Sequence, residues 1–150
     1  MAFHQVRDIM RKSCRDHEAV VEFYDELVEL AGDDERLKYI LNLMIEHQET
    51  IIHCIKEYLK TKDSSVLNSW FQYLPDMPVP TESLVELNDI NQHSAWSIFN
   101  EVNQKFLMNY EKLSNFSHSE SVHELFQEMK NLTSHEGERE GWRYIMLDDI

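Results

Sequence analysis

The segment NLMIEHQETIIHC, residues 42–54, carries the side chains best suited to chemistry. Within about two helical turns it holds two carboxylates and two imidazoles, those of Glu46, His47, Glu49 and His53. Imidazole nitrogens and carboxylate oxygens at this spacing are common ligands of zinc and iron. The same residues would also suit the solvated face of an ordinary helix. The choice between the two depends on which of them the helix turns inward.

Apolar periodicity predicts two helices in the first half of the chain, over about residues 6–31 and about residues 35–59. Gly32 is expected to stop the first helix, and an aspartate after it to cap the second. Each helix has an inward seam that alternates steps of four and three residues. The seams are Met10, Cys14, His17, Val21, Tyr24 and Val28, then Leu37, Ile40, Met44, His47, Ile51, Cys54 and Tyr58.

The periodicity fails over about residues 60–80, which are expected to form a long crossover rich in aromatic residues. A third helix is expected to start near Thr81, where Ser83 and Glu86 have capping-box spacing. A fourth is expected near Ser121, which has the same spacing to a glutamate. Their seams are Trp96, Asn100, Asn103, Leu107, Tyr110 and Leu113, then Val122, Phe126, Met129, Thr133 and Glu136.

These elements predict an all-α protein with a single domain over residues 1–150, a length that can bury one substantial core. Two antiparallel hairpins joined by a long crossover make a ferritin-like four-helix bundle. The two halves also match each other without a gap from Tyr24 and from Tyr110 onward, with Leu43 aligned to Met129. The alternative is that any two helical hairpins share such an apolar pattern.

With this repeat the chain resembles the ferritin-like superfamily, and within it the small rubrerythrin-like proteins. In that family each hairpin has a Glu one seam step before the Tyr, and a Phe-x-x-Leu-Ala-x-Glu-Glu-x-x-His pattern in its second helix. The first Glu, the second Glu of the pair and the His bind iron. The resemblance implies six ligand positions, which here hold His17, His47 and Thr50, then Asn103, Thr133 and Glu136.

This set departs from the family, because a di-iron site uses about four carboxylates and only Glu136 is present. Di-iron oxidase or peroxidase chemistry is therefore not expected to carry over. Two interpretations remain. One is a single zinc or iron ion held by His17, His47, Glu136 and Asn103; the other is a buried polar layer whose members satisfy each other's hydrogen bonds.

The other three charged or imidazole residues of the opening segment are interpreted differently from His47. Glu46, Glu49 and His53 fall outside the seam of their helix, so they are expected to face solvent. His47 lies on the seam and is expected to face His17 in the interior.

Composition narrows the range of partners. A net charge of −14 repels phosphate backbones and anionic lipid surfaces, so neither nucleic acid nor membrane is an expected partner. No apolar run is long enough to span a bilayer, and the chain is expected to be cytoplasmic. Cys14 and Cys54 are expected to be reduced, buried thiols. No motif of a nucleophilic enzyme or of phosphate binding occurs, which does not favour an enzyme.

The function expected from these features is that of a non-catalytic binding or structural module, with no cofactor required. The alternative is a metalloprotein with a non-standard single-metal site in the bundle core, which would allow redox chemistry. The aromatics of the crossover, Trp70, Phe71 and Tyr73, would serve either as a lid over the bundle or as an exposed interface, and a homodimer is the expected assembly.

Overall fold

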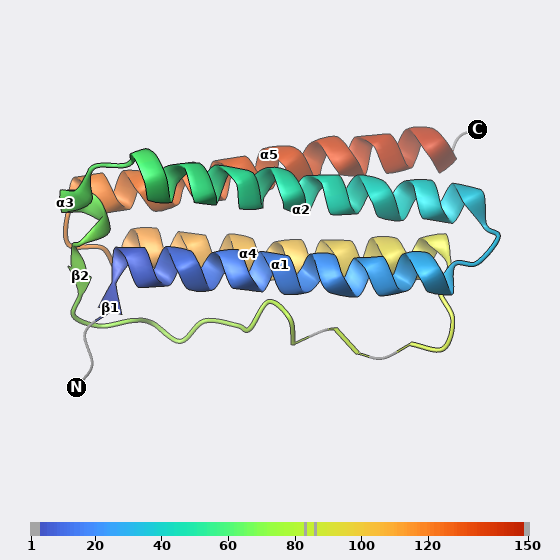
Figure 1. Ribbon diagram of the computed structural model, residues 1–150, viewed down its shortest axis with the longest axis horizontal. Helices are drawn as coiled ribbons and strands as arrows, with labels where there is room; N and C mark the ends of the chain where they lie inside the picture. The colour runs from blue at the N-terminus through green and yellow to red at the C-terminus, as the bar shows by residue number, and fades with distance from the viewer. Residues whose placement is uncertain (1–3, 83, 86, 149–150) are drawn as a thin grey trace.

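The protein is all-α, as predicted. The computed structural model describes residues 4–82, 84–85 and 87–148, with side chains described up to residue 134. Four long helices make up most of this chain: α1 (Val6–Leu30), α2 (Glu35–Thr61), α4 (Gln92–Asn115) and α5 (Glu120–Asp148). A short helix, α3 (Ser64–Leu67), and two two-residue strands, β1 (His4–Gln5) and β2 (Trp70–Phe71), gather at one end (Figure 1). In the described part of the chain, no helix is long and apolar enough to cross a membrane.

The four long helices lie side by side as two antiparallel hairpins, α1–α2 and α4–α5, and most helix–helix contacts fall within a hairpin. Helix α2 also contacts α5 and α4. The connector, residues 62–91, runs along the length of the molecule beside α1 before α4 begins (Figure 1). Because the connector returns to the end where α2 began, α2 and α4 point in the same direction.

The first hairpin follows the sequence prediction closely. Gly32 has φ = 60°, in the left-handed region that glycine adopts without steric cost, and it ends α1 as expected. The carboxylate of Asp34 accepts a 3.1 Å hydrogen bond from the backbone N–H of Leu37 and so caps α2. Both predicted helices agree with the observed ones to within two residues at each end.

The predicted start of the third helix was wrong. Helix α4 begins at Gln92, where Asn91 and Ser94 cap each other reciprocally, and not near Thr81. Ser83 and Glu86 themselves lie outside the described residues. The described residues between Thr81 and Gln92 are non-helical, and Leu84, Leu87 and Ile90 among them pack partly buried against the core. The expected start depended on capping-box spacing alone, which does not by itself place a helix.

The predicted seam of α4 is also shifted at its start. Ala95, Phe99, Val102 and Phe106 are the buried residues of the first turns, whereas Asn100 is exposed. Trp96 and Leu107 are only partly buried. The seam agrees with the prediction at Asn103, Tyr110 and Leu113, and in α5 at Val122, Phe126, Met129 and Thr133.

The connector is fixed to the helices at both of its halves. Strand β2 pairs with β1, placing His4 opposite Phe71, and the Phe71 ring packs edge-on against Phe126 at a centroid distance of 6.0 Å. Further along, Asn109 Nδ2 donates to the carbonyl of Pro78, and Lys112 Nζ donates to the carbonyl of Asp76. The connector therefore covers one side of the helices and is not a loose loop.

Candidate functional site

The opening segment divides as predicted into one inward residue and three outward ones. His47 is fully buried, and Glu46, Glu49 and His53 are all exposed. The conspicuous cluster of acidic and imidazole groups is therefore a surface feature. The interior chemistry of this helix lies with His47 and with its neighbour Gln48, which is also buried.

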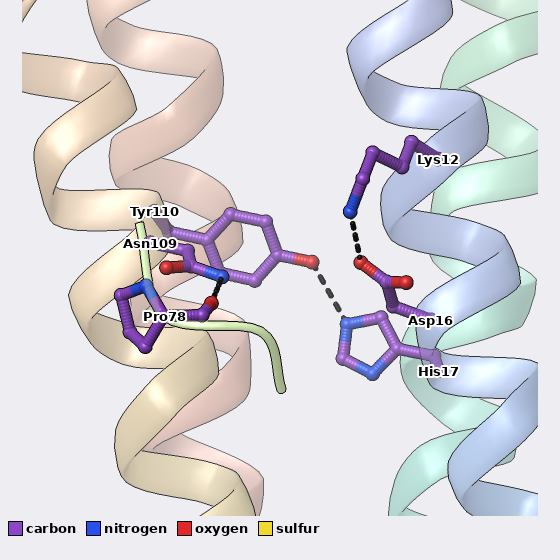
Figure 2. A network of polar contacts seen from close by, with 6 residues as sticks. All are labelled: Lys12, Asp16, His17, Pro78, Asn109 and Tyr110. Carbon is purple, nitrogen blue, oxygen red and sulfur yellow. Dashed lines mark hydrogen bonds and ion pairs between the residues drawn. The ribbon is translucent and has the colours of Figure 1, made fainter. Parts of the chain in front are cut away.

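His17 lies at the centre of a buried hydrogen-bonded chain that joins three helices. Its Nδ1 is 2.6 Å from Oε1 of Gln48 on α2, and its Nε2 is 2.8 Å from the hydroxyl of Tyr110 on α4. Figure 2 shows the Tyr110 hydroxyl pointing across from α4 to the imidazole on α1. An amide oxygen only accepts, so Nδ1 carries the proton, Nε2 accepts, and Tyr110 donates. Both ring nitrogens are thus occupied.

The surroundings of His17 keep its ring neutral. The imidazole stacks on Phe106, with ring centroids 3.7 Å apart and an angle of 9° between the planes. Burial lowers the pKa of His17 to about 4, against a smaller opposing effect of the hydrogen bond to Gln48. The tautomer inferred from the hydrogen bonds is the neutral form that this pKa requires near pH 7.

His47 lies in an aromatic setting in the same interior. Its ring meets Phe99 of α4 edge-on, with centroids 5.2 Å apart. Phe99 in turn stacks on Trp96 at 5.3 Å. The predicted interior position of His47 is confirmed. Its contact with the aromatic residue Phe99 of α4 was not predicted.

The remaining family ligand positions are placed unevenly. Thr133 is fully buried, and its hydroxyl donates to the carbonyl of Met129 one turn earlier. Asn103 is buried as well. Thr50 is exposed and donates to the carbonyl of Glu46, so it does not join the interior set. The side chain of Glu136 lies outside the described residues.

Two other buried oxygens lack hydrogen bonds. Tyr24 and Asn103 align with Tyr110 and His17 in the repeat, because each lies 86 residues from its match (110 − 24 and 103 − 17). Within the described part of the chain, the Tyr24 hydroxyl and the Asn103 Oδ1 atom have no hydrogen-bond partner. Tyr110 and His17 are therefore hydrogen-bonded to each other, and the residues aligned with them are not.

The sequence interpretation missed Gln48 and Tyr110 as the partners of His17. Gln48 could have been found, because Leu41, Met44, Gln48 and Ile51 form a continuous buried stripe at steps of three and four. A polar residue in such a stripe needs a hydrogen-bond partner. Tyr110 stood on the predicted seam, but its partner depends on how the hairpins dock.

The donor set does not fit two irons. Among the residues that the structure describes, no three His, Cys, Asp or Glu side chains converge where a metal ion could bind. Asn103 and Thr133 bring no negative charge, and His17 has no ring nitrogen left for a metal. Of these groups, His17 makes hydrogen bonds between helices, and Thr133 makes one within its own helix.

Cys14 is not an activated nucleophile. Cys14 and Cys54 are both free, as predicted, but Cys14 alone of the two is buried, and Cys54 is partly exposed, contrary to the prediction. The Cys14 thiol donates to the carboxylate of Glu18 at 3.6 Å, and burial, followed by that negative charge, raises its pKa. A thiol with a raised pKa is a poor nucleophile near neutral pH.

Comparisons with known proteins add no family assignment. No family model, no curated protein and no solved structure matches this chain. The resemblance to the ferritin-like superfamily therefore rests on the sequence repeat and on the arrangement of the helices.

Proposed function

We propose that this chain is a ferritin-like four-helix bundle that works as a non-catalytic binding or structural module. The arrangement of the helices supports the fold. Two antiparallel hairpins are joined by a connector that runs their full length, so the second and third long helices are parallel. Ferritin-like bundles have one such long crossover.

The observation that carries the non-catalytic role is the double hydrogen bonding of His17 to Gln48 and Tyr110. A histidine that binds a metal must present one unprotonated nitrogen to the ion. In this core that nitrogen accepts from a tyrosine on another helix. His17, at one of the six ligand positions, thus links the first hairpin to the second, which supports a structural role for this residue.

A second candidate is a single-metal site built on the buried His47 and Asn103, for which Glu136 is the expected carboxylate ligand although its side chain lies outside the described residues. The observation that favours it is the pair of buried oxygens of Tyr24 and Asn103 that have no hydrogen-bond partner in the described part of the chain. Buried polar atoms of this kind are costly unless something satisfies them. One ion or a bound water would do so.

Metal analysis of the full chain, purified without an affinity tag, separates the two candidates. After incubation with Fe(II) or Zn(II) and desalting, we expect far less than one ion per chain and no peroxide-dependent oxidase activity. One ion per chain that is lost in His47→Ala and kept in His53→Ala would establish the second candidate. Two irons per chain would overturn both.

We also propose a homodimer, formed at the end of the molecule that carries β2. Trp70 is 54% exposed and Tyr73 is 63% exposed there. A pocket of about 230 Å³ lies between β2 and the start of α5, lined in part by Trp70, Phe71 and Val122. Aromatic side chains are enriched in the centres of interfaces. Sedimentation of the wild type and of a Trp70→Ser, Tyr73→Ser variant tests it: a monomer in both would overturn the dimer.

A further inference from the structure

A pocket of about 490 Å³ opens between the C-terminal half of α1 and the connector. Six of its lining side chains are apolar and one is a carboxylate: Phe23, Leu27, Leu30, Leu84, Val85, Leu87 and Glu26. Two of the apolar ones are well exposed, Leu30 at 37% and Val85 at 58%. Among the described residues Glu26 is the one charged group in its wall, so these residues offer little to orient a small polar ligand, and the pocket suits apolar side chains.

The α1 side of the pocket is strongly acidic. Residues 22–35 contain seven carboxylates and no Lys or Arg, and Glu26 among them lines the pocket. Glu22, Glu26 and Glu29, which we call the acidic rim, are exposed and make no ion pair within the described chain, whereas Lys12 and Asp16 in the first half of the same helix are paired at 2.9 Å. The last turn of α1 also lacks a basic residue, so Glu29 lies at the negative end of the helix dipole.

This charge arrangement is unfavourable in the isolated chain. Like charges spaced three or four residues apart on a helix destabilise it. A cation bound beside Glu22, Glu26 and Glu29 would reverse the sign of that interaction. The apolar pocket supplies the contact area, and the rim determines which charge its occupant must carry.

We propose that this pocket docks a cationic amphipathic helix of a partner protein. Its apolar side chains, at helical i, i+3 and i+4 spacing, enter between Leu30 and Val85. Lys and Arg side chains on the flanking faces of that helix pair with the carboxylates of the rim. A second copy of this chain is a poor occupant, because it brings a net charge of −14 to an acidic surface.

The inference rests on the proposed binding role and names its partner class. The test measures fluorescence anisotropy of a labelled peptide of about 18 residues with Leu at helical spacing and Lys elsewhere, long enough to form a helix. The full chain is titrated into this peptide and into a scrambled peptide of the same composition. We expect the patterned peptide to bind at least about 10-fold more tightly than the scrambled one.

Two matched pairs of variants test whether the peptide binds at the pocket or elsewhere on the surface. Val85 and Val79 both lie exposed on the connector, at 58% and 52%, but only Val85 lines the pocket. Val85→Lys is expected to weaken binding about 10-fold or more, and Val79→Lys less than about 2-fold. Glu26→Lys is likewise expected to weaken binding about 10-fold or more. Glu124→Lys changes an exposed carboxylate away from the pocket and is expected to weaken binding less than about 2-fold.

Three results would overturn the inference. The scrambled peptide would bind equally well if net charge alone were responsible. The two valine variants would behave alike if the peptide bound elsewhere. A dimer of the wild type that Val85→Lys dissociates would assign the pocket to a second copy. None of these depends on metal content, so failure here is distinguishable from failure of the non-catalytic role.

Discussion

The hydroxyl of Tyr110 donates a 2.8 Å hydrogen bond to Nε2 of His17, 93 positions away in the chain. This bond links the first hairpin to the second through the interior. Tyr24, which the repeat aligns with Tyr110, is equally buried, but its hydroxyl has no hydrogen-bond partner among the described residues. The two tyrosines therefore form a matched pair of buried residues, of which Tyr110 makes this hydrogen bond to His17 and Tyr24 has no partner for its hydroxyl in the described chain.

Changing each tyrosine to phenylalanine should have different effects on stability. Tyr110→Phe leaves Nε2 of His17 buried without a donor, and we expect the free energy of unfolding to fall by about 1–3 kcal/mol. Tyr24→Phe removes a hydroxyl that has no partner in the described chain, so we expect a change of less than about 0.5 kcal/mol or a small gain. Urea denaturation of both variants measures the difference. Equal losses would contradict the assignment of the hydrogen bond.

The buried neutral imidazole predicts a loss of stability in acid. Above pH 6.5, the ordinary pKa, His17 is neutral in both folded and unfolded chains. Between pH 6.5 and about 4 only the unfolded chain takes up the proton, so the free energy of unfolding falls as the pH falls. The full effect is about 3 kcal/mol, since one pKa unit corresponds to about 1.4 kcal/mol.

Urea titrations at pH 7 and pH 5 measure this effect when two variants are compared with the wild type. His17→Asn places in the first hairpin the residue found at the aligned position, Asn103, and should lose this part of the pH dependence. His53→Gln removes an exposed histidine and should keep it. An unchanged pH dependence in His17→Asn would show that other groups cause it.

The turn between α1 and α2 should require glycine because of its backbone conformation, and not because a side chain would lack space there. An added Cβ at Gly32 would meet no atom within 4 Å, yet φ is +60°. We expect Gly32→Ala to destabilise the protein by about 1 kcal/mol. Gly32→Asn should recover part of that loss, because asparagine tolerates the left-handed region. Thermal melts of the three proteins test the order, and an alanine variant as stable as the wild type would contradict it.

The connector should lose its anchor when Phe71 is truncated. Phe71 is 1% exposed and packs against Phe126, whereas Tyr73, two residues later, is 63% exposed. We expect Phe71→Ala to cost about 3–5 kcal/mol and Tyr73→Ala less than about 1 kcal/mol. Proteolysis within residues 72–90 should also become faster in Phe71→Ala alone. Similar stabilities of the two variants would mean that β2 contributes little.

The elements that the sequence predicted well are those fixed by local signals. The turn at Gly32 and the cap at Asp34 depend on residues within a few positions of each other. The outward position of Glu49 and His53 follows from the period of one helix. These features need no knowledge of how the hairpins pack.

The errors and omissions concern choices that only packing decides. In the first turns of α4, the stripe through Phe99 and the one through Asn100 are both compatible with a helix, and contact with His47 places Phe99 inside. The capping-box spacing near Thr81 does not start a helix, and Leu84 and Leu87 of that segment instead pack partly buried against the core. The hydrogen bond of His17 to Tyr110 likewise depends on docking between two separate hairpins.

The division of the molecule into two hairpins has a consequence for how the chain folds. Contacts within α1–α2 and within α4–α5 span short stretches of sequence and dominate over those between the pairs. Local contacts close small loops at low entropic cost, so each hairpin is expected to assemble quickly. Docking of one hairpin on the other is then the long-range and slower step. Because the hydrogen bond between His17 and Tyr110 forms only in that step, it stabilises only the alignment of the hairpins in which these two side chains meet.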